Sequence, residues 1–161
     1  MHKVNDYIIY KRNVCKITNI LPKYYQNTDY YILCPISDNT LTIKIPTNNK
    51  DIRNLLTINE IDTLISSIPN IKIIDSNTRE LESIYKKLLQ TGLHEDLIKI
   101  IKTTYIRNKD RLDNNKKTTD KDTYYFNLAE EYLYNEIATV LNISFDDAKE
   151  YVINKVSKLC K

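Results

Sequence analysis

The apolar residues of this chain change their spacing once, near residue 57, and that change limits the folds that the chain can adopt. Before it, short apolar stretches alternate with polar residues and are separated by turn residues, which is typical of half-buried β-strands. After it, apolar residues recur every three or four positions, which is typical of amphipathic helices. The sequence therefore predicts an α+β protein, with a small antiparallel sheet followed by an all-helical domain.

Four candidate strands precede the change: Asp6–Lys11, Val14–Leu21, Tyr30–Ile36 and Leu41–Pro46. Because they are short and closely spaced, we expect a meander of four or five strands that curls into a small β-barrel or a strongly bent sheet. Alternation in the second strand predicts Cys15, Ile17 and Asn19 on one face. In the fourth strand, Lys44 is a lone cation on the face opposite Ile43 and Ile45.

The remaining chain predicts one helix over residues 57–68 and four more over residues 78–91, 93–107, 123–141 and 144–159. The first begins at Thr57 or Asn59 and is expected to seal the barrel or to lead out of it. Pro69 ends it, and residues 69–77 are predicted to link two domains, 1–70 and 77–161. The last four helices are expected to form a bundle. Gly92, the only glycine, is predicted to be a left-handed helix end, and Ser144 an N-cap.

Few residues favour catalysis. The three cysteines, Cys15, Cys34 and Cys160, lack metal-ligand spacing, and no signal peptide or membrane-spanning segment is evident. Reduced thiols in the cytoplasm are therefore expected. A single glycine excludes a phosphate-binding loop, and His94 with Asp96 has poor geometry for a metal pair. We expect no enzyme activity, no catalytic residue, no metal, no cofactor and no small-molecule substrate. A small nucleic-acid-modifying or thiol enzyme is the disfavoured alternative.

The net charge is only +3, so contact with nucleic acid would depend on local clustering of cations. The most basic segment runs from Lys99 to Asp122, with a polar loop predicted over residues 108–122. It is either a solvated loop or a phosphate-contacting patch. The adjacent tyrosine pairs could stack on bases, but they are more readily explained as aromatic core. These pairs are Tyr24–Tyr25, Tyr30–Tyr31 and Tyr124–Tyr125.

Several motifs together have the order and spacing of a known family. They are Asn5–Tyr10, Asn13–Ile17, Tyr30–Leu33, Leu41–Pro46, Lys87–Ile101 and Ala129–Ala138. In this order, over nearly the whole chain, they resemble the CarD family of bacterial transcription regulators. The resemblance implies an N-terminal Tudor-like barrel that binds the RNA polymerase β subunit, as in transcription-repair coupling factors. It also implies a helical domain that touches promoter DNA, a nucleoid association through polymerase, and no membrane partner.

The resemblance assigns polymerase contacts to the barrel. Lys44 matches the cation that faces the β subunit in the family, Thr42 shares its strand face, and Lys23 approximately matches a second basic position. The resemblance aligns family glycines with Asn5, Asn13 and Cys15; asparagine tolerates left-handed backbone better than other residues do, but cysteine does not.

The resemblance also assigns DNA contacts to the helical domain. A family tryptophan that wedges into the minor groove aligns with Thr78, whose hydroxyl cannot unstack bases. Weak promoter contacts are expected from the residues Thr78, Arg79, Lys86, Lys87, Lys102, Arg107 and Lys121. Two functions stay open: a regulator that modulates the stability of the open promoter complex, and a divergent paralogue that docks on polymerase without binding DNA.

Overall fold

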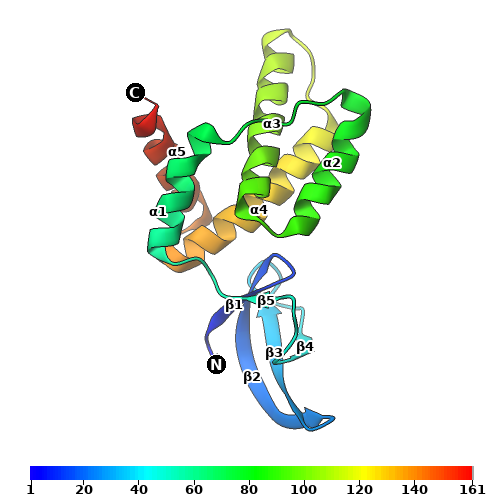
Figure 1. The fold of residues 1–161 in the computed structure, drawn as a ribbon, viewed down its shortest axis with the longest axis vertical. Coiled ribbons are helices and arrows are strands. Elements are labelled where there is room, and N and C mark those ends of the chain that lie inside the picture. Colours follow the sequence, from blue (N-terminus) through cyan, green and yellow to red (C-terminus); the bar gives the residue numbers. More distant parts are fainter. Residues whose placement is uncertain (161) are drawn as a thin grey trace. The chain divides into compact units, whose positions relative to one another are not determined.

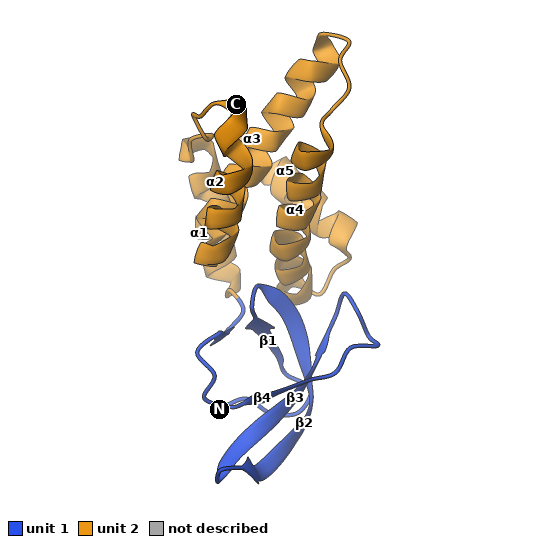
Figure 2. Cartoon of the chain, turned by 90° about the vertical axis from the view of Figure 1, so that its right-hand side faces the viewer, with its two compact units in different colours: residues 1–55 blue, residues 56–161 orange. Residues whose placement is uncertain are grey.

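The computed structural model describes residues 1–160 and divides into two compact units, Met1–Leu55 and Leu56–Lys161 (Figures 1 and 2). The first unit holds the strands β1 (Tyr7–Tyr10), β2 (Asn13–Tyr25), β3 (Thr28–Pro35), β4 (Ile43–Pro46) and β5 (Ile52–Arg53). The second holds the helices α1 (Ile58–Ser67), η1 (Ile68–Asn70, 3-10), α2 (Thr78–Thr91), α3 (His94–Asp113), α4 (Asp120–Leu141) and α5 (Phe145–Leu159). The predicted α+β class is confirmed.

The strands form one open antiparallel sheet in the order β4-β3-β2-β1-β5. The predicted barrel is wrong, because β4 and β5 lie at opposite edges and do not pair. Both are short: β4 has 4 residues and β5 has 2. Such short edge strands leave few backbone groups with which to close a sheet.

A bulge in β2 changes which residues reach the core of the sheet. The pairing with β3 shifts register between Ile17 and Asn19, so that Ile17 pairs with Leu33 and Ile20 pairs with Tyr31. Ile20, not Asn19, therefore packs on the buried cluster, and Asn19 is exposed. The expected alternation fails at this point, because one extra residue inverts the faces that follow it.

Backbone conformation tests the positions at which family glycines are replaced. Asn5 adopts a left-handed conformation, with φ 77°, whereas Asn13 and Cys15 do not. The two-residue turn of the β1–β2 hairpin is instead left-handed at Lys11 and Arg12. Positive φ at both central residues is the conformation of a type I′ hairpin turn.

Helix α1 belongs to the helical unit, although the sequence-based division grouped residues 1–70 together. Its buried residues Ile61 and Ile65 join the helical core. The expected linker is also part of this unit, because Ile71 is buried in the same core and the Ile74 amide donates to Thr103 Oγ1 (2.9 Å). The bundle therefore has five α-helices within the described residues.

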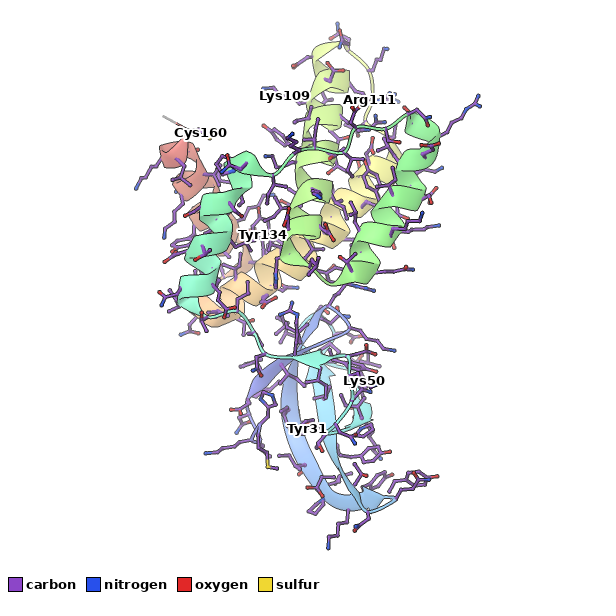
Figure 3. The ribbon with its side chains drawn as sticks, in the orientation of Figure 1. Tyr31, Lys50, Lys109, Arg111, Tyr134 and Cys160 are labelled. Atoms are coloured by element: carbon purple, nitrogen blue, oxygen red, sulfur yellow. The ribbon has the colours of Figure 1, made fainter. Side chains whose placement is uncertain are left out.

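Two predicted helix ends are confirmed and one predicted loop is shortened. Gly92 is left-handed at the end of α2, with φ 71°, and the Ser144 side chain accepts from the Asp147 amide at the start of α5. The polar loop predicted over 108–122 is mostly helical, because α3 continues to Asp113 and α4 begins at Asp120. Arg111 closes the short connection by donating from Nε to the Lys117 carbonyl (2.7 Å; Figure 3).

Candidate functional site

The first candidate surface surrounds Lys44, which points away from the core of the sheet. Ile45 is buried, while its neighbour Lys44 is exposed opposite Ile32 of β3. Lys44 Nζ lies 3.5 Å from Tyr24 Oη and 5.2 Å from the centroid of the Tyr24 ring. The Tyr24 ring is in turn 5.3 Å from that of Tyr30. We call these three residues the Lys44 face: a cation over the ring of Tyr24, which contacts the ring of Tyr30 at an inclined angle.

The Lys44 face lies beside an open edge. Strand β4 is the last strand on its side, so within residues 1–160 no further strand pairs with its outer backbone. Thr42 is exposed immediately before β4. Lys23 is also exposed, in a second irregularity of β2, where its amide donates to Asp29 Oδ1 (2.9 Å) and its φ is 47°. Lys23 immediately precedes Tyr24 in the chain, so all three predicted polymerase contacts are solvent-exposed.

The second candidate surface is a cleft of about 260 Å³ in the helical unit. It lies where the N-terminal ends of α2 and α4 meet the middle of α3. We call it the N-terminal cleft, and its lining comprises Thr78, Arg79, Leu81, Glu82, Tyr85, Arg107, Thr119, Lys121 and Asp122. The structure thus gathers four of the seven predicted DNA contacts, from three helices, around one opening.

A buried carboxylate organises the floor of this cleft. Asp122 is 3% exposed; its Oδ1 accepts from Tyr85 Oη (3.0 Å) and its Oδ2 from Arg107 Nε (3.0 Å). The charge of Arg107 compensates the buried carboxylate. Burial, with Asp122 adding to the effect, raises the pKa of Tyr85, so this hydroxyl remains a donor well into the alkaline range.

The electrostatics of the N-terminal cleft favour an anion, but only mildly. Arg79, Arg107 and Lys121 face two carboxylates, those of Glu82 and Asp122. Two helix N-termini add positive potential. Glu82 counteracts it: Lys121 Nζ lies 3.0 Å from Glu82 Oε2, and that hydrogen bond lowers the pKa of Glu82. Arg79 is exposed and, among residues 1–160, forms no ion pair with a carboxylate.

The other three predicted DNA contacts lie elsewhere. Lys86 and Lys87 are exposed on α2, and Lys86 lies 3.7 Å from Glu82. Lys102 is not part of this surface, because its ammonium donates to the carbonyls of Ile68 (2.8 Å) and Ile71. These two hydrogen bonds attach the segment that follows α1 to helix α3.

The tyrosine pairs divide between core and surface. Tyr31 and Tyr125 are buried as predicted, but Tyr24 and Tyr25 are 52% and 58% exposed. Tyr24 and Tyr30 were not predicted to lie beside Lys44. The bulge that positions them leaves no periodic signal, because it interrupts the alternation on which strand prediction depends.

Thr119 and Asp122 were not predicted to be site residues. Thr119 is the N-cap of α4 and accepts from the Asp122 amide (3.2 Å). A threonine three residues before an acidic residue was the available signal.

Comparison with known proteins adds nothing to this geometry: no protein-family model matches the chain, and no curated protein matches it. Among residues 1–160, no group of three His, Cys, Asp or Glu side chains is placed to hold a metal ion. No helix within the same range is long and apolar enough to cross a membrane.

Proposed function

We propose that this protein is a non-enzymatic transcription regulator that docks on the β subunit of bacterial RNA polymerase through its sheet. The observation that supports this most directly is the Lys44 face. The resemblance assigns polymerase contact to Lys44, and this side chain is exposed on an edge strand, beside tyrosines, in a unit with its own core.

Two properties of the Lys44 face suit a protein partner. Tyrosines held in one orientation supply large contact area at low entropic cost and are enriched among the residues that dominate binding energy. An open edge such as β4 can also accept a strand of the partner, which adds backbone hydrogen bonds. A β-subunit segment with an extended backbone and a carboxylate opposite Lys44 satisfies both.

The same proposal gives the N-terminal cleft a supporting role on promoter DNA. Arg79, Arg107 and Lys121 supply phosphate contacts, whose strength falls steeply with salt. Thr78 occupies the first turn of α2, at the family wedge position, and its small side chain cannot open a base step. DNA contact by this protein therefore stabilises the open complex weakly, and only while the protein is bound to polymerase.

One observation favours the second function, docking without DNA contact. Asp122 and Glu82 engage Arg107 and Lys121, so much of the positive charge of the cleft is already compensated. A divergent regulator of this type occupies the polymerase site and competes with DNA-contacting relatives.

Docking is tested with a charge reversal on the Lys44 face and a matched reversal outside it. Lys44→Glu is expected to weaken β-subunit binding by about 1–3 kcal/mol. The substitution removes a cation from the interface and places a negative charge opposite the carboxylate of the β subunit. Lys50→Glu, at another exposed lysine of the same unit, should leave the affinity unchanged (Figure 3). Equal affinities of the two variants, measured by titration calorimetry, would contradict the proposal.

The DNA role is tested on open-complex lifetime at a promoter with polymerase present. If the cleft contacts phosphate, Arg79→Glu should shorten the lifetime, and Thr78→Trp should lengthen it by restoring a wedge. An unchanged lifetime in Arg79→Glu, with retained polymerase affinity, would select the function without DNA contact.

A further inference from the structure

The helical unit contains an apolar cavity that the proposed function does not use. It measures about 480 Å³ and lies among α3, α4 and α5, with the start of η1 at its border. Its lining is mainly aliphatic and aromatic: Ile68, Ile98, Ile101, Tyr105, Phe126, Leu133, Tyr134, Val152, Ile153 and Val156. The cavity opens to solvent past the exposed side chains of Tyr105 and Ile153, and a contiguous exposed apolar surface of this kind marks an interaction site or a ligand-binding groove.

The size and composition of this cavity match those of small-molecule sites. Such sites typically measure roughly 300–1,000 Å³ and carry a few polar groups among apolar ones. The rim is apolar as well: Tyr105 and Ile153, both in the lining, are 58% and 49% exposed. A ligand with a hydrocarbon tail would remove this surface from water.

Three charged side chains in the lining determine which head group fits. Lys149 Nζ lies 3.2 Å from Oε1 and 3.0 Å from Oε2 of the buried Glu130, so these two charges neutralise each other. Lys102 differs, because its partners are the backbone carbonyls of Ile68 and Ile71, which carry no full charge. An ammonium has three N–H groups, and these contacts use two. Within the described part of the chain, no carboxylate pairs with Lys102.

We propose that the cavity binds a hydrophobic monocarboxylate, with its tail among Leu133, Val152 and Val156 and its carboxylate at Lys102. A neutral alcohol would leave the charge of Lys102 unmatched. An alkylammonium would be repelled by Lys102, and it would have to compete with Lys149 for Glu130. This site lies beyond the proposed polymerase and DNA contacts.

The head-group preference is tested by titrating the full chain with decanoate, decanol and decylammonium, each below its micelle concentration. Binding is followed by calorimetry and by NMR shifts of the isoleucine methyl groups that line the cavity. Decanoate should bind about tenfold more tightly than decanol, as a charge-assisted hydrogen bond implies, and decylammonium most weakly. Equal affinities for the three, or no shift at Ile98 and Ile101 with decanoate, would overturn the proposal.

Substitutions at the rim test the charge without disturbing the core. Because Ile153 is half exposed, Ile153→Glu and Ile153→Lys should both fold. The first should weaken decanoate binding several-fold and the second should retain or strengthen it. Asn154→Glu makes the same charge change at an exposed neighbour on α5 that does not line the cavity, and it should have little effect. Parallel effects of Ile153→Glu and Asn154→Glu would show non-specific electrostatics and overturn the assignment of the site.

Discussion

At the scale of the residue, the buried Asp122 is the group on which the N-terminal cleft depends most. It holds Tyr85 and Arg107 by one hydrogen bond each. Asp122→Asn keeps the size of the side chain but removes the charge that compensates the Arg107 guanidinium. We expect the helical unit to lose about 1–3 kcal/mol of unfolding free energy, measured by urea titration.

The matched control for this residue lies two positions earlier. Asp120→Asn removes an equal charge from the same first turn of α4, but Asp120 is exposed. Asp120→Asn should lower the free energy of unfolding only by the lost interaction with the helix dipole, about 0.3–1 kcal/mol. If the two variants lose equal stability, the hydrogen-bonded junction contributes nothing beyond the dipole.

At the scale of the element, the β2–β3 hairpin is limited by its turn. Gln26 and Asn27 join Tyr25 to Thr28 with φ values of 49° and 59°, the positive-φ pair of a type I′ turn. Asn-Gly is the preferred pair for this turn, whereas glutamine tolerates left-handed backbone poorly. Replacing both residues, Gln26→Asn with Asn27→Gly, should stabilise the sheet unit by about 1 kcal/mol.

The turn prediction has a direct readout and a direct control. Urea unfolding of the full chain, followed at the methyl groups of the sheet isoleucines, should shift its midpoint upward. Asn115→Gly, at the left-handed residue of the connection after α3, should leave those signals unaffected, because it lies in the other unit. An unchanged or lower midpoint for the sheet would show that the native turn is not strained.

At the scale of the whole molecule, the two units should lose stability in different alkaline ranges. Burial, with Cys34 adding to the effect, raises the pKa of the Cys15 thiol to about 11, and Cys15 is fully buried in the sheet. Burial, with Glu130 adding to the effect, raises the pKa of Tyr134 to about 12 in the helical unit (Figure 3). Both are acids whose neutral form is favoured by folding, so their contributions are complete below the unfolded-state pKa and are lost as pH rises.

As the pH rises, the two units should therefore lose stability one after the other. The thiol contribution is lost between about pH 9 and 11 and the phenol contribution between about pH 10 and 12, so the sheet unit should weaken first. The sheet should lose about 1–2 kcal/mol between pH 8 and 10. Cys15→Val, which keeps an apolar side chain, should abolish most of that dependence. If the sheet of this variant weakens with pH as the parent does, Cys15 is not the group responsible.

Local chemistry explains the features that could be predicted. The change of apolar period near residue 57 separates sheet from helices, Gly92 and Ser144 mark helix ends, and alternation puts Lys44 outside. Each depends on a residue and its immediate neighbours in the chain, through backbone preference, capping or side-chain alternation.

The features that could not be predicted all depend on distant partners. Periodicity shows that Ile61 and Ile65 of α1 share an apolar face, but the sheet and the helical core could each have covered that face. Closure of the sheet into a barrel would have required β4 and β5 to pair with each other. The N-terminal cleft exists because α4 places Asp122 against Arg107 of α3. A sequence shows which surfaces must be buried. Which partner buries each one is set by the packing of all the elements together, because the free energy of burial does not depend on direction.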